Sequence, residues 1–160
     1  MKSTIAICLL GMVFVGVASA EVVRPAPSVK WVDASGKERS STDFRGQPLV
    51  VLITPEVRTW GFGRQLARLR GTFEKLAAHK TVFVAAFTRE PGIVPSNIPF
   101  AVASDGPKVA YEFGVEDGFA IAIISPEGNI DYITSKVLPG QRVLDVIRNS
   151  YAEQSRMRRR

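Results

Sequence analysis

The stretch Leu49-Val50-Val51-Leu52-Ile53 is a continuous apolar run with three β-branched residues. Such a run is typical of a strand covered on both faces, as in a parallel or mixed sheet. Pro55 ends it, and a helix is predicted from about Gly61 to His79. The apolar residues of this helix are spaced three or four apart: Leu66, Leu69, Phe73 and Leu76. A second buried strand, Thr81 to Phe87, follows, so a β-α-β unit is expected at the centre of the fold.

Weaker signals surround this unit. Further strands are predicted at 29–33, 99–103, 119–124 and 130–133, and helical segments at 41–46, 107–113 and 143–151. Ser41 or Thr42 is expected to cap the first of these helical segments. Pro126 to Asn129 predicts a turn, which makes the last two strands an antiparallel hairpin. Together these elements predict an α/β fold, a three-layer α/β/α sandwich with a mixed central sheet.

The first twenty residues have the pattern of a signal peptide. Lys2 supplies a positive start, Ile5 to Val17 is almost wholly apolar, and Ala18-Ser19-Ala20 fits a cleavage site. The expected organisation is therefore a signal peptide at 1–20, an extended leader at 21–28, a domain at 29–152 and a basic tail at 153–160. The processed protein would be periplasmic or secreted and would have no transmembrane segment. Its only cysteine, Cys8, would be removed with the signal.

The net charge of the chain, +6, is unevenly placed along the sequence. Four of the last five residues, Arg156 to Arg160, are arginines, and without them and the signal the net charge falls to +1. We therefore attribute the high isoelectric point to the tail rather than to a basic face. A tail of this kind could touch acidic lipid head groups or cell-surface polymers, although a solvated end is the simpler interpretation. No nucleic acid partner is expected, because base-reading aromatic residues are not interleaved with the basic ones.

Four segments resemble the redoxin branch of the thioredoxin superfamily, which includes peroxiredoxins and periplasmic thiol-disulfide proteins. Together they span about residues 29–150: Asp33-Ala-Ser-Gly-Lys37 with Thr42-Asp-Phe-Arg-Gly-Gln-Pro-Leu-Val-Val51, Pro99-Phe100 with Ala103-Ser-Asp105, Val109-Ala-Tyr-Glu-Phe-Gly-Val115, and Ile123-Ile-Ser-Pro-Glu-Gly-Asn-Ile130. The resemblance implies a thioredoxin-like fold.

The catalytic positions depart from that resemblance. The peroxiredoxin motif P-x-x-x-T-x-x-C keeps its Pro55 and Thr59 here, but Phe62 stands in the position of the peroxidatic cysteine. The C-x-x-C motif of thiol-disulfide proteins falls on residues 58–61, which contain no cysteine. Phe119 occupies the position of the cis-proline or arginine that precedes the later strand. Since this chemistry needs a thiolate, the resemblance does not carry the activity over.

These same positions form the candidate binding surface. Its residues are predicted to lie where thioredoxin-like proteins meet their partners: Arg58, Thr59, Trp60, Phe62, Arg64 and Phe119. A helix N-terminus favours negative charge, and Trp and Arg are enriched in interface hot spots. A protein or an acidic peptide of the cell envelope is the expected partner. The alternative is that Trp60 and Phe62 fill space that catalytic groups occupy in redoxins.

Other chemistry finds little support. The single histidine, His79, is expected to interact with the end of its helix rather than with a metal, and no cofactor or metal site is predicted. Glu116 and Asp117 are expected to approach the arginines at 58–64.

The first hypothesis for the function of the chain is a non-redox binding or structural module. The alternatives are a redoxin-family antioxidant or thiol-disulfide role exerted through a partner thiol protein, and surface adhesion through the basic tail. The sequence leaves the oligomeric state open.

Overall fold

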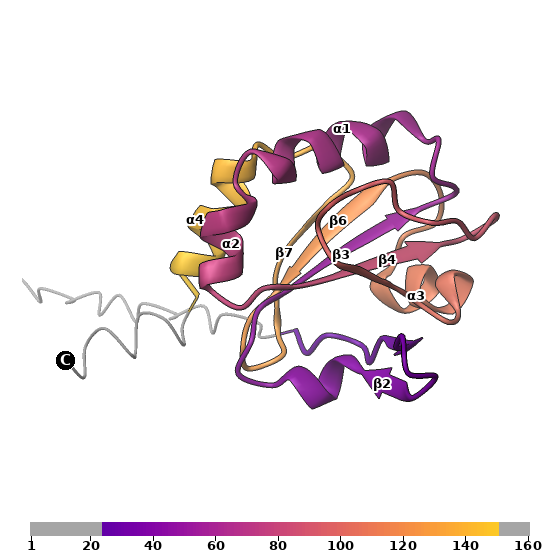
Figure 1. The fold of residues 1–160 in the computed structure, drawn as a ribbon, viewed down its shortest axis with the longest axis horizontal. Coiled ribbons are helices and arrows are strands. Elements are labelled where there is room, and N and C mark those ends of the chain that lie inside the picture. Colours follow the sequence, from indigo (N-terminus) through magenta and orange to yellow (C-terminus); the bar gives the residue numbers. More distant parts are fainter. Residues whose placement is uncertain (1–23, 151–160) are drawn as a thin grey trace, which may run out of the picture.

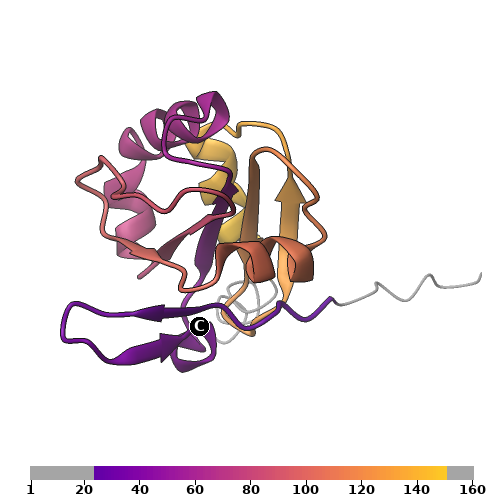
Figure 2. The ribbon, with the colours of Figure 1, turned by 90° about the vertical axis from the view of Figure 1, so that its right-hand side faces the viewer.

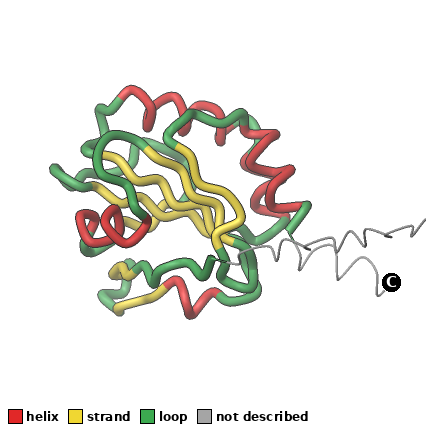
Figure 3. The backbone as a smooth tube through the Cα atoms, turned by 180° about the vertical axis from the view of Figure 1, so that it is seen from behind, coloured by secondary structure: helices red, strands yellow, loops and turns green. Residues whose placement is uncertain are grey.

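The computed structural model describes residues 24–150, which form a mixed five-stranded sheet in the order β5-β4-β3-β6-β7 (Figure 1). The central strand β3 (Leu49–Thr54) runs parallel to β4 (Val82–Phe87), which runs parallel to the edge strand β5 (Phe100–Val102). On its other side β3 pairs antiparallel with β6 (Ala120–Ile124), and β6 with β7 (Ile130–Thr134). Seen from behind, the five strands form one twisted layer between the helices (Figure 3). The predicted β-α-β unit and hairpin are confirmed.

Helices cover both faces of the sheet. One face carries α1 (Trp60–Arg70), α2 (Phe73–Ala78) and α4 (Gly140–Arg148). The other carries α3 (Gly106–Phe113) together with a segment that comes before β3 in the chain. The predicted three-layer α/β/α sandwich with a mixed sheet is therefore confirmed.

The segment before β3 is an antiparallel hairpin of β1 (Lys30–Val32) and β2 (Glu38–Ser40), followed by the 3₁₀ helix η1 (Ser41–Phe44). Figure 2 shows this hairpin as an arm on the α3 side of the molecule. The sequence predicted β1 but not β2, whose residues Glu38, Arg39 and Ser40 show no apolar alternation.

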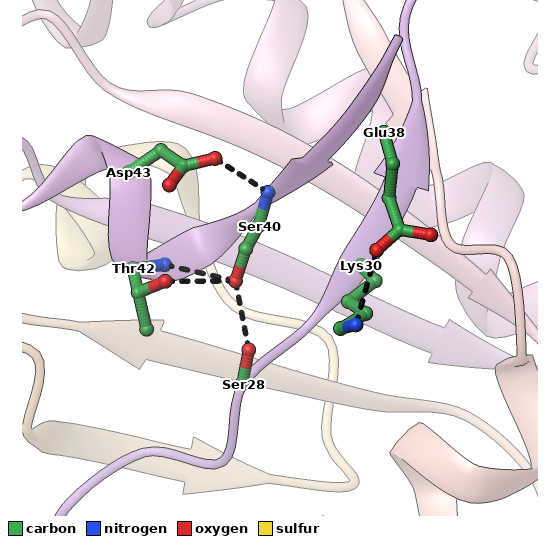
Figure 4. A network of polar contacts seen from close by, with 6 residues as sticks. All are labelled: Ser28, Lys30, Glu38, Ser40, Thr42 and Asp43. Carbon is green, nitrogen blue, oxygen red and sulfur yellow. Dashed lines mark hydrogen bonds and ion pairs between the residues drawn. The ribbon is translucent and has the colours of Figure 1, made fainter.

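Ser40, rather than Ser41 or Thr42, caps η1, so the predicted cap was one residue out. The Ser40 hydroxyl accepts a hydrogen bond from the Thr42 backbone N–H at 3.3 Å, and the Asp43 carboxylate accepts one from the Ser40 N–H at 2.9 Å (Figure 4). This reciprocal pair is a capping box. Ser28 adds a hydroxyl contact to Ser40 at 2.8 Å, which ties the start of β1 to the end of β2.

The predicted helix from Gly61 to His79 is in fact two helices. The chain turns at Gly71 and Thr72, and α2 starts at Phe73. Gly140, at the start of α4, lies against this turn: a Cβ on Gly140 would come within 2.5 Å of the Arg68 carbonyl oxygen. The break falls at Gly71, the C-cap of α1, and it places the turn against the start of α4, although the apolar stripe of the sequence runs on without interruption.

A buried amide fixes α1 to the connection between β7 and α4. Gln65 is fully buried; its Oε1 accepts from the Leu138 N–H at 2.8 Å and its Nε2 donates to the Leu138 carbonyl at 3.1 Å. Both backbone groups of Leu138 are thereby satisfied away from water, a condition that buried polar groups require. The position of α1 over the sheet is thus specified by polar as well as apolar contacts.

The described part of the predicted leader joins the edge of the sheet. Pro25 forms an antiparallel bridge with Asn129, the Ala26 N–H donates to Gly128 O, and the Ile130 N–H donates to Arg24 O, both at 2.8 Å. Residues 24–26 are therefore a short extension beside β7. The predicted signal peptide, the tail at 153–160 and Tyr151 of the predicted last helix lie outside the described residues.

Candidate functional site

The segment that leads from β3 into α1 forms a closed turn. Pro55 follows the last residue of β3, Thr54, whose buried hydroxyl donates to Glu56 O at 3.3 Å. The Thr59 N–H donates to the same carbonyl at 3.2 Å, and the Thr59 hydroxyl accepts from the Glu56 N–H at 3.4 Å. Thr59 is the N-cap residue of α1, but its side chain bonds back into the turn rather than to the helix. The turn thus sets the direction in which α1 leaves the sheet.

The first turn of α1 places an aromatic residue and a cation in solvent. Trp60 is 70% exposed, and the guanidinium of Arg64 lies 5.2 Å from the centre of its ring. The two residues are four apart and so share one face of the helix. Arg58 and Arg64 are exposed, and Thr59 is half-buried. We call Arg58, Thr59, Trp60 and Arg64 the α1 entrance.

Two residues of the predicted binding surface are buried. Phe62 has no exposed surface and meets Phe87 edge to face, with ring centres 5.6 Å apart. Phe119 is 8% exposed and packs on the backbone of Gly61, where an added Cβ would come within 2.8 Å of its ring. Both predictions of surface contact were wrong for the same reason: these rings complete the apolar layer beneath α1. The alternative that these side chains fill space inside the protein therefore agrees with the burial of Phe62 and disagrees with the exposure of Trp60.

A cleft lies beside the α1 entrance, between the turn and the loop after β4. It encloses about 250 Å³ and is lined by Glu56, Val57, Arg58, Glu90, Pro91 and Gly92. The walls fit tightly at Gly92, where a Cβ would collide with Val57. Further along, Arg70 Nη2 donates to Pro95 O at 2.5 Å, which holds the loop against α1.

The sequence analysis did not include this loop, which follows β4, in the candidate site. Ile93, at its tip, is 91% exposed. The available signal was an apolar residue between two prolines, Pro91 and Pro95, in a segment that predicts neither helix nor strand. The cleft also mixes charges, since Glu56, Arg58 and Glu90 all line it.

Glu116 and Asp117 do not lie where the sequence predicted. Asp117 pairs with Arg89 at 3.2 Å, in a contact in which both side chains are more than 70% exposed. Arg89 follows β4 and Asp117 precedes β6, and these two strand ends lie on either side of the C-terminal end of β3. The expected pairing with the arginines at 58–64 is therefore wrong for Asp117, whose ion pair is with Arg89. An ion pair this exposed contributes little to stability.

The chemistry available at the α1 entrance is that of recognition. Its groups are two guanidinium ions, an indole and a hydroxyl, and residues 24–150 contain no cysteine. Within residues 24–150, no three His, Cys, Asp or Glu side chains gather in a way that could hold a metal ion. Over the same residues, no helix is long and apolar enough to cross a membrane.

Comparison with known proteins finds likeness in structure and not in sequence. No protein-family model matches the chain, and no curated protein matches it. Among solved structures, peroxidoxin BcpB from Mycobacterium tuberculosis aligns with a TM-score of 0.60 and 16% identity, over 79% of this chain and 95% of that one.

Two thiol:disulfide interchange proteins give similar values. The protein from Chlorobium tepidum TLS aligns with a TM-score of 0.62 and 19% identity, over 79% of this chain and 97% of that one. The one from Bacteroides sp. aligns with a TM-score of 0.62 and 18% identity, over 86% and 97%. These identities are informative about fold alone. The chain has a thioredoxin-like α/β fold whose structural relatives include peroxiredoxins and thiol-disulfide interchange proteins.

Proposed function

We propose that this chain is an exported, thioredoxin-like binding module that does no thiol chemistry of its own and recognises a protein of the cell envelope through the α1 entrance. The observation that carries the proposal is the exposed Trp60 with Arg64 stacked on it, at the helix end where redoxins place a reactive thiol. A large exposed indole loses little conformational freedom on binding and buries much apolar area, which makes it an effective anchor.

The chemistry of the surroundings specifies the kind of partner. Arg64 and Arg58 offer guanidinium groups to carboxylates, and no acidic residue is present in the first turn of α1. The neighbouring cleft, with Val57, Pro91 and two glutamates, offers apolar and negative groups. The partner that fits is a polypeptide segment with an apolar residue for Trp60, a carboxylate for Arg64 and a polar or basic group near Glu90.

Site-specific crosslinking tests the binding surface. A photoreactive amino acid replaces Trp60 in the chain expressed in cells, and the matched control carries the same group at Tyr111, which is 85% exposed on α3. We expect one specific adduct from position 60 and none from position 111. Excess unmodified protein should compete with the adduct, and Arg64→Ala should weaken it. Equal adducts at both positions, or no competition, would reject the proposed surface.

Turnover assays test the absence of thiol chemistry. Peroxide consumption and insulin reduction by the purified chain should not exceed those of a boiled control, because residues 24–150 supply no thiolate. Turnover that appears only when a thiol protein is added would favour the alternative of a redoxin-family role through a partner. Mass spectrometry of the secreted chain checks export: the expected N-terminus lies near Glu21.

A further inference from the structure

The three helices on one face of the sheet carry a net positive charge. Helices α1, α2 and α4 contain six basic residues and two acidic ones, for a net charge of +4. The rest of residues 24–150 contains ten basic and eleven acidic residues, for a net charge of −1. All six basic side chains of the helices are exposed: Arg64, Arg68, Arg70, Lys75, Arg142 and Arg148. The structure therefore has a basic face, contrary to our attribution of the high isoelectric point to the tail alone.

The charges of this basic helical face are not neutralised by ion pairs. Within residues 24–150 the ion pairs join Lys30 to Glu38, Arg39 to Asp33, Arg89 to Asp117 and Lys108 to Glu112, and none includes a residue of α1, α2 or α4. Of the two acids on this face, Asp145 accepts a hydrogen bond from Gln141 at 2.7 Å. Arg64 and Arg142 lie over the rings of Trp60 and Tyr132, which leaves their charge in place.

The arrangement of these charges favours an extended partner surface. They are distributed over three helices, and the outer side of a helix is convex, so it does not enclose a peptide.

We propose that the basic helical face binds the anionic head groups of a phospholipid bilayer. Each Lys or Arg held near an anionic membrane surface contributes to binding, and the attraction decays over roughly 10 Å at about 0.1 M salt. A spread of cations suits a plane of negative charge, and such binding is reversible without a lipid anchor or an inserted helix. The proposal does not depend on the polypeptide partner of the α1 entrance.

Vesicle co-sedimentation tests it with the secreted chain, its N-terminus read by mass spectrometry. Vesicles of phosphatidylcholine with about 30% phosphatidylglycerol should retain the protein, and pure phosphatidylcholine vesicles should not. Replacing Arg68, Arg142 and Arg148 together by Gln should lower the partition coefficient at least about tenfold. The chain without residues 156–160 should still bind, and about 0.5 M salt should abolish binding.

The matched control removes the same charge from the other face. Replacing Lys30, Lys37 and Lys108 together by Gln lowers the net charge equally, but these residues lie in or beside β1 and α3. We expect this variant to keep binding within about threefold. Circular dichroism verifies that both variants fold. Equal losses in the two variants would mean that only net charge matters and would overturn the proposal. So would failure of the wild-type chain to bind phosphatidylglycerol vesicles, or binding that depends on the tail alone.

Discussion

The two faces of the sheet are packed with side chains of different size. Beneath α1, α2 and α4 the core is built from large residues, among them Phe62, Phe83 and Leu69. Beneath α3 and the β1–β2 hairpin it contains several small ones: Ala86, Ala103, Ala110, Ala120 and Ala122. The strands supply both sets by alternation, so that Ile121 and Ile123 point to the first face, and Ala120 and Ala122 to the second.

The size of these side chains affects how closely a helix approaches the sheet on each face. On the small-residue face α3 approaches until Gly106 touches the backbone of Phe87, and the hairpin carries the ion pairs Lys30–Glu38 and Arg39–Asp33. On the large-residue face aromatic rings lie between α1 and the sheet, and among residues 24–150 the cations of α1, α2 and α4 form no ion pairs. The hairpin on one face therefore pairs most of its charges with neighbouring residues, whereas the cations of the helices on the other face have no acidic partner among residues 24–150.

The largest effect on stability is expected from truncating Phe62, whose ring is buried on the large-residue face. Phe62→Ala removes a fully buried side chain and its edge-to-face contact with Phe87, and should lower the free energy of unfolding by about 3–5 kcal/mol. Trp60→Ala, two residues earlier and mostly exposed, should change it by less than about 0.5 kcal/mol. Urea denaturation measures both. A large loss in Trp60→Ala would mean that the indole stabilises the fold and is not reserved for binding.

The second prediction compares equal additions to the two faces. Gly106→Ala places a Cβ within 2.5 Å of the Phe87 carbonyl carbon and should destabilise the protein by about 1–3 kcal/mol. Gly63→Ala, on the exposed side of α1, meets nothing within 4 Å and should stabilise it by about 0.5–1 kcal/mol through helix propensity. Thermal unfolding should therefore shift in opposite directions. A neutral Gly106→Ala would show that α3 has room to move away from the sheet.

The sequence predicted most of the fold because its central strands are unambiguous. LVVLI and the run from Thr81 to Phe87 have no competing interpretation, and Gly114, with φ of 71°, ends α3 as expected. The break between α1 and α2 was missed because one glycine, Gly71, weakens a helix by only about 1 kcal/mol, and the contact of Gly140 with the turn is distant in sequence. Strand β2 was missed because its pairing with β1, and not its own composition, makes it a strand.

The site was harder to predict for a geometric reason. The resemblance located the turn after β3, but it could not separate Trp60, which points outward, from Phe62, which points into the core. Two residues along a helix is a rotation of about 200°, so the two side chains take opposite directions once the phase of the helix is known. That phase is set by the turn through Glu56 and Thr59, whose hydrogen bonds leave no composition signal.

The smallest and most local prediction concerns the hairpin of the small-residue face. The hydroxyl of Ser35 donates to the Asp33 carboxylate at 2.5 Å, Arg39 Nε donates at 2.8 Å and the Lys37 N–H at 3.1 Å. These bonds, that of Ser35 first, hold the pKa of Asp33 well below its usual range. A lowered pKa means that folding favours the charged carboxylate. The stabilisation is therefore complete above the ordinary Asp value of about 3.9 and is lost as the pH falls below it.

The Lys37 amide proton reports this titration by NMR. Its chemical shift should stay constant down to pH values below the ordinary Asp range and then move, while the buried amides of α1 do not respond. Asp33→Asn should remove the movement and alter the Lys37 and Arg39 signals already at neutral pH. If the Lys37 amide instead titrates at the value of an unperturbed aspartate, the hairpin does not hold its carboxylate as the structure shows. The small-residue face would then satisfy its charges no better than the basic helical face.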